Sequence, residues 1–170
     1  MPDTEKMAIV SRVIAEHQAI RHNVNLMGES MNDLEAILNL EQRKQEWTPG
    51  KPETVTEKQA KLEQTLMTLG QGLKNHFSFE EKYLFPLTGE LLAESLTLDH
   101  KRITRELEAA STLVREMPLG DIAPKELAAQ EDQIRKMIHS LHHLVEKHAT
   151  TENAIIESMN RALQERQGTW

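Results

Sequence analysis

Six prolines divide this chain into four long proline-free stretches, and that division constrains its fold more than any other feature. Proline is strongly disfavoured inside a helix, because its ring clashes with the preceding turn and it has no N–H group to donate. The prolines stand at positions 2, 49, 52, 86, 118 and 124. They predict connections at residues 47–52, 85–89 and 117–124, each joining two long regular elements.

The four stretches between these connections carry apolar residues at the three- and four-residue spacing of an amphipathic helix. None shows the alternation of a half-buried strand. Four helices with short connections favour an all-α, antiparallel up-down four-helix bundle, and 170 residues suit a single domain over residues 1–170. The predicted inward positions of the first two stretches include Val10, Ile14, His17, Val24 and Met31, and then Leu66, Leu69, His76, Glu80 and Tyr83.

Charge and residue usage exclude several classes of partner and chemistry. The formal net charge is −7 and no basic patch stands out, so we expect neither nucleic acid nor an anionic membrane as a partner. The absence of cysteine excludes disulfides, thiolate catalysis and cysteine-bound iron–sulfur clusters. Neither a signal peptide nor an apolar run of bilayer length is present, and we expect a soluble, cytoplasmic protein.

Each predicted apolar stripe is interrupted by one histidine, and two of these histidines are followed four residues later by glutamate. Positions four apart lie on one face of a helix, so each such pair can reach the same site. Burying imidazoles and carboxylates without partners is costly, whereas a metal ion accepts the imidazole lone pair and offsets the carboxylate charge. The stretch lengths bring the four histidines to approximately one level. We therefore predict a metal site in the core, bound by His17, His76, Glu80, His100, His148 and Glu152.

Simpler alternatives exist for each residue taken alone. A single inward histidine is commonly a core residue with ordinary hydrogen bonds, and a single His-x-x-x-Glu is commonly a surface pair. Six such positions on four helices favour the metal site. The histidines at 22, 139, 142 and 143 turn away from the predicted core, which favours surface or supporting positions over a nickel- or zinc-binding patch. The ferritin-type Glu-x-x-His and the zinc-protease His-Glu-x-x-His motifs are both absent.

The order His, His-x-x-x-Glu, His, His-x-x-x-Glu on four successive helices resembles the hemerythrin-like (HHE cation-binding) domain family. Residues 76–86, HFSFEEKYLFP, are similar to the most specific segment of that family, in which His and Glu-Glu precede Leu-Phe-Pro. The dipeptides Glu16-His17 and Asp99-His100 fit its isolated-histidine positions. The resemblance covers residues 10–160, which is nearly the whole chain.

This resemblance implies two iron ions in a non-haem di-iron centre, completed by a solvent-derived oxo or hydroxo bridge. It also implies a division of the ligands between the two irons. The two carboxylates would bridge both irons, and each iron would take two of the four histidines. The implied assignment is Glu80 and Glu152 as bridges, His17 and His76 on one iron, and His100 and His148 on the other.

The chain departs from oxygen-carrying hemerythrins at two positions. The carriers have a second histidine four residues after the one on the third helix, and here Thr104 follows His100 at that spacing. They also end with an aspartate five residues after the last histidine, whereas here Glu152 follows at a spacing of four. In both respects the chain resembles the bacterial HHE group, which includes oxygen or nitric oxide sensors and iron–sulfur repair proteins.

We therefore expect a protein that senses or reacts with a small oxidant, namely dioxygen, peroxide or nitric oxide. The six side chains supply about four donors per iron, against about six in an octahedral site, which leaves room for an exogenous ligand. Three alternatives stay open: a peroxidase/catalase-like or nitric-oxide-reducing enzyme, a protein that stores or donates iron for iron–sulfur repair, and a metal-free interaction module. A sensor would also need a protein partner or a change of homo-oligomer. Tyr83, on the same predicted face as His76, is a candidate hydrogen-bond or electron donor to the site.

Overall fold

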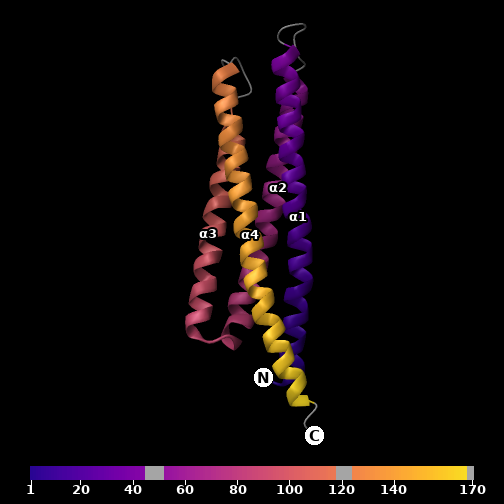
Figure 1. The fold of residues 1–170 in the computed structure, drawn as a ribbon, viewed down its shortest axis with the longest axis vertical. Helices are drawn as coiled ribbons and strands as arrows, with labels where there is room; N and C mark the ends of the chain where they lie inside the picture. The colour runs from indigo at the N-terminus through magenta and orange to yellow at the C-terminus, as the bar shows by residue number, and fades with distance from the viewer. Residues whose placement is uncertain (45–51, 118–123, 168–170) are drawn as a thin grey trace.

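The chain folds as the predicted antiparallel up-down four-helix bundle (Figure 1). The computed structural model describes residues 1–44, 52–117 and 124–167. Within these ranges every long element is a helix and no strand is present. The four helices are α1 (Asp3–Lys44), α2 (Pro52–Phe79), α3 (Glu90–Glu116) and α4 (Pro124–Gln167).

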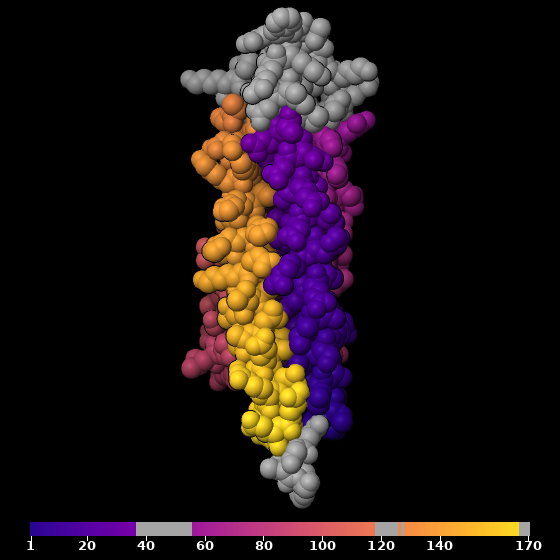
Figure 2. Space-filling view, turned by 45° about the vertical axis from the view of Figure 1, so that its right-hand side comes forward, coloured from indigo at the N-terminus to yellow at the C-terminus, as the bar shows by residue number. Residues whose placement is uncertain are grey.

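Each helix packs against the two that flank it around the bundle, so that α1 contacts α2 and α4, and α3 also contacts α2 and α4. Figure 2 shows α1 and α4 lying side by side along an elongated molecule. The start of α1 and the end of α4 lie at the same end of the bundle (Figure 1). Side chains on four helices can therefore meet at one level of the common core.

The predicted connections at 47–52 and 117–124 lie largely outside the described residues, although α2 and α4 begin at Pro52 and Pro124 as the proline positions suggested. The predicted connection at 85–89 is described and is more regular than a loop. A π-helical turn, η1 (Glu80–Leu84), leads into a 3-10 turn, η2 (Phe85–Leu87). Gly89 then takes a φ of 91°, a left-handed conformation that favours glycine, before α3 starts.

The buried apolar residues form two clusters, one on each side of a buried polar layer. The larger cluster includes Ile20, Phe77 and Val145, and the smaller one includes Val13 and Leu84. The histidines and glutamates predicted as ligands occupy the positions in between and are buried. This polar layer consists of His17, His76, Glu80, His100, His148 and Glu152.

Two predicted inward positions are wrong. Tyr83 is 37% exposed, and its ring packs against Phe79 and Lys82 on the surface. The π-helical turn holds more residues per turn than an α-helix, which rotates Tyr83 away from the face of His76. Ile14 is also 37% exposed, at the edge of the α1 stripe, and Val13 is buried in its place. Among the described helices, none has an apolar stretch that could span a lipid bilayer.

Candidate metal centre

The six residues of the polar layer converge in the middle of the bundle, with side-chain exposures between 0% and 4%. The four helices bring one histidine each, and α4 and the start of η1 bring the glutamates. The layer divides into two groups of four residues, whose potential ligand atoms all lie within 4.8 Å of one another. The first half comprises His17, His76, Glu80 and Glu152, and the second half comprises His100, His148, Glu80 and Glu152.

In the first half, the histidines approach the carboxylates through Nε2. The Nε2 atom of His76 lies 2.8 Å from Oε1 of Glu80. The Nε2 atom of His17 lies 3.1 Å from Oε2 of Glu152 and 3.4 Å from Oε1 of Glu80. The Nε2 atom of His17 therefore faces both carboxylates, and that of His76 faces Glu80.

The second half uses the same two carboxylates. The Nε2 atom of His100 lies 3.3 Å from Oε2 of Glu80, and that of His148 lies 3.3 Å from Oε2 of Glu152. The two Nε2 atoms lie 3.1 Å apart. Glu80 thus directs one oxygen toward each half, which is the arrangement that a bridging carboxylate needs.

The charges of this layer compensate each other in the absence of metal. Burial alone would lower the pKa of His17, but the adjacent carboxylates of Glu152 and Glu80 outweigh it and raise that pKa to about 10. Burial alone would raise the pKa of Glu80, yet the imidazoles of His100, His17 and His76, which face its oxygens, hold that pKa well below its usual range. The metal-free site is consequently stabilised by at least one imidazolium facing ionised carboxylate.

Protonation of the histidines does not give every buried polar atom of this layer a hydrogen-bond partner. Buried atoms without a hydrogen-bond partner include Nε2 of His76, both carboxylate oxygens of Glu80 and Oε1 of Glu152. Unpaired buried polar atoms are rare and costly, and these four point into one small volume between two helix pairs. Imidazole nitrogens and carboxylate oxygens are also the donors that iron and other transition metals prefer. The donor set fits metal cations.

A second set of polar residues faces the other ring nitrogen, Nδ1, of each of the four histidines. Nδ1 of His17 donates to Asn153 at 2.8 Å, Nδ1 of His76 donates to Glu16 at 2.9 Å, and Nδ1 of His100 donates to Glu81 at 2.9 Å. Nδ1 of His148 lies 3.8 Å from Asp99, within ion-pair range but beyond a hydrogen bond. We call Glu16, Glu81, Asp99 and Asn153 the outer ring.

The outer ring was not assigned a role from the sequence. Its members do carry a simple signal, because each is the immediate neighbour in sequence of a predicted ligand. The four remaining histidines lie where their helix faces predicted: His22, His139 and His143 are exposed, and His142 is half-buried. Among the described residues, none of these four belongs to a group able to hold a metal.

Aromatic rings enclose the second half. Phe77 stacks on His100 with ring centroids 3.8 Å apart and an interplanar angle of 11°. Phe85 covers His100 as well, with its centroid at 5.1 Å. The imidazole therefore has little freedom to rotate, which keeps its Nε2 directed at the carboxylates.

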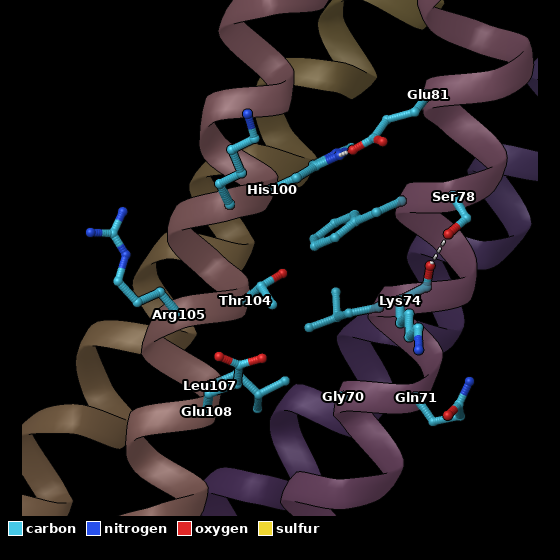
Figure 3. Close-up of a pocket in the computed structure, with 13 residues that line it drawn as sticks. Gly70, Gln71, Lys74, Ser78, Glu81, His100, Thr104, Arg105, Leu107 and Glu108 are labelled. Atoms are coloured by element: carbon cyan, nitrogen blue, oxygen red, sulfur yellow. Dashed lines mark hydrogen bonds and ion pairs between the residues drawn. The ribbon is translucent and has the colours of Figure 1, made fainter.

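A cleft of about 580 Å³ between α2 and α3 reaches His100 from the surface. Leu73, Phe77 and Leu107 line its apolar part. In Figure 3, Thr104 points into the gap between the two helices, whereas Arg105 points away from it. A smaller pocket of about 180 Å³ between α1 and α4 is lined by His17 and Asn153 among others. Each half of the centre thus lies beside its own surface depression.

Comparison with protein-family models matches residues 8–159 to the model described as the Hemerythrin HHE cation binding domain. The matched range contains the whole polar layer and the whole outer ring. Comparisons with curated proteins and with solved structures gave no significant match.

Proposed function

The chain belongs to the hemerythrin HHE cation-binding domain family, and on this premise we propose that it binds two iron ions and senses or reacts with a small oxidant. The proposed ligands are the six residues of the polar layer. The oxidant would be dioxygen, peroxide or nitric oxide. Bound iron would supply the one-electron redox chemistry, and the protein supplies position, access and the exclusion of bulk water.

The sharing of two carboxylates between two histidine pairs is the observation that carries this proposal. A single-metal site needs only one group of ligands. Here two groups are present, and both include Glu80 and Glu152. The separate directions of the two Glu80 oxygens support a bridging role, because Oε1 faces His17 and His76 while Oε2 faces His100. Two adjacent cations would also offset the two buried carboxylate charges.

Room for a small ligand supports the choice of oxidant chemistry. Four imidazoles and two bridging carboxylates provide about four donors per ion, and octahedral iron takes about six. Beside His100, the next position on the α3 face is the short Thr104, and the cleft between α2 and α3 opens there. Its apolar part suits an uncharged diatomic molecule or peroxide better than a large polar substrate.

The two apolar clusters on either side of the polar layer would protect the centre. They exclude water along the bundle axis and leave the side openings as the approach. Phe77, which stacks on His100, lines the cleft and restricts access through it to small molecules.

Metal analysis, together with absorption spectra of protein purified with and without air, tests the proposal. We expect two iron ions per chain and absorption bands that change when the reduced protein meets oxidant. Glu80→Ala should remove most iron, whereas Glu94→Ala, an exposed glutamate on α3, should not. Iron content near zero after growth with ample iron would refute the di-iron assignment.

The same preparations separate the proposed function from its alternatives. Sustained consumption of peroxide or nitric oxide by the purified protein would identify an enzyme. Loss of iron to an apo-protein acceptor within minutes would identify an iron donor. A single oxidation event without turnover, accompanied by a change of oligomer or of partner binding, is the result expected of a sensor.

A further inference from the structure

The contacts between the outer ring and the four histidines form a closed cycle around the bundle. One polar residue from each of α1, η1, α3 and α4 faces the histidine of the next long helix, and the residue of α4 faces the histidine of α1. Each contributing residue is adjacent in sequence to a residue of the polar layer. The pairs are Glu16 with His76, Glu81 with His100, Asp99 with His148, and Asn153 with His17.

Helix direction explains the regularity of this cycle. Neighbouring residues on a helix differ by about 100° in direction, so the neighbour of an inward residue points toward one flanking helix. On α1 and α3, which run the same way, the contributing residue precedes the inward histidine. In η1, which continues α2, and on α4, both of which run the opposite way, it follows the inward glutamate. Reversing a helix reverses the sense of rotation, so all four residues point the same way around the bundle.

The cycle is chemically uneven. Three members are carboxylates, and the fourth, Asn153, is a neutral amide on the first half. The other member of the first half, Glu16, also accepts a hydrogen bond from Nε of Arg12 at 2.7 Å, which offsets its charge. On the second half, Glu81 and Asp99 have no ion pair with lysine or arginine among the described residues. The second half therefore carries more uncompensated negative charge.

We propose that the outer ring positions the metal-binding histidines and makes the two metal positions unequal, with Asn153 as the residue that sets the difference. This inference rests on the proposed di-iron function. A histidine that donates from Nδ1 to a carboxylate is the stronger metal ligand through Nε2, and loss of such a partner typically costs about 10- to 100-fold in metal affinity. On the second half His100 donates to Glu81 in this way, and the carboxylate of Asp99 lies 3.8 Å from Nδ1 of His148. With these two uncompensated carboxylates, the metal position of the second half holds its ion more firmly and at a lower reduction potential than that of the first half.

The test uses substitutions that separate charge from hydrogen bonding. Asn153→Asp adds the missing charge, and the pocket beside Asn153 gives it access to solvent. Glu81→Gln removes a charge but keeps an acceptor for His100, while Glu81→Leu removes both. Asn160→Asp, a half-buried position two turns further along α4, is the matched control for added charge.

Two measurements report on the two positions: the kinetics of iron loss to a chelator, and the two midpoint potentials of the iron-loaded protein. We expect two phases of iron loss in the wild-type protein. Asn153→Asp should slow the fast phase by about 10-fold and lower the higher potential. Glu81→Gln should raise the lower potential, and Glu81→Leu should also accelerate the slow phase. Asn160→Asp should leave both phases and both potentials unchanged.

Loss of both ions at the same rate from the wild-type protein, or an Asn153→Asp variant that behaves like Asn160→Asp, would refute the proposed difference between the two metal positions. Neither result would refute the di-iron function. A wild-type protein that binds no iron would overturn both.

Discussion

The affinity for metal should depend steeply on pH, because the metal-free centre holds a proton that a metal ion must displace. His17 is 4% exposed and lies between the carboxylates of Glu152 and Glu80, which raise its pKa to about 10. Its Nε2 atom is the proposed metal donor, and a protonated Nε2 cannot bind metal. At any pH well below 10, binding of metal to the first half therefore releases at least one proton.

The structure sets the magnitude of this effect. One displaced proton changes the apparent affinity about tenfold per pH unit, so the first half should bind iron about 100-fold more tightly at pH 9 than at pH 7. The pKa of His76 is raised too, since burial, which lowers it, is outweighed by Glu80 and Glu16. Glu80 adds no proton in this range because its pKa is lowered and it is already ionised.

The stability of the metal-free protein should change in the opposite direction. The folded pKa of His17 lies above its ordinary value of 6.5, so the ion pair stabilises the fold fully below pH 6.5 and loses its contribution as pH rises toward 10. Rising pH thus weakens the metal-free fold and strengthens metal binding. The increase in melting temperature on iron loading should grow from pH 6.5 to pH 9.

Anaerobic competition between the protein and a ferrous chelator, corrected for the chelator's own protonation, measures the affinity at each pH. Proton release on iron addition in weakly buffered solution gives the proton count directly. His139→Ala, which removes an exposed histidine of α4, is the control and should preserve both the slope and the count. Affinity that is constant between pH 7 and pH 9, with no proton released, would refute the compensation of buried charges in the polar layer.

Three further predictions concern single side chains. Glu80→Ala should strip iron from both halves, since this carboxylate is common to them, whereas His142→Ala should leave the iron content unchanged in elemental analysis; iron loss in the His142 variant would contradict the assigned face of α4. In air, the reduced wild-type protein should oxidise irreversibly within minutes, and Thr104→His should slow this by filling the cleft beside the centre, as stopped-flow absorbance would show; reversible oxygenation of the unmodified protein would favour a carrier instead. Phe77→Ala should lower the free energy of unfolding by about 3–5 kcal/mol in denaturant titrations, because it removes a buried ring stacked on a ligand, and a loss below about 1 kcal/mol would show that the stack contributes little.

The fold and the polar layer were accessible from the sequence because both depend on local rules. Proline positions mark where helices cannot continue, and the spacing of apolar residues defines the inward face of each helix. A polar residue on that face stands out against its apolar neighbours, as His100 does between Leu96 and Ile103. The six predicted residues therefore meet in the structure, and their role as metal ligands stays a prediction.

Other features became visible only with all four helices in place. Periodicity gives the direction of a side chain about its own helix axis, but it does not say which atom on a neighbouring helix that side chain meets. The hydrogen bond from His17 to Asn153 joins residues 136 positions apart, and nothing in either local sequence specifies it. The π-helical turn that moves Tyr83 to the surface likewise breaks the regular spacing on which the prediction relied. The sequence by itself determined most of the residues that face the core, because the direction of a side chain depends on its own helix. Tertiary packing decided the partners of those residues and the uneven charge around the two halves, because both arise from contacts between helices.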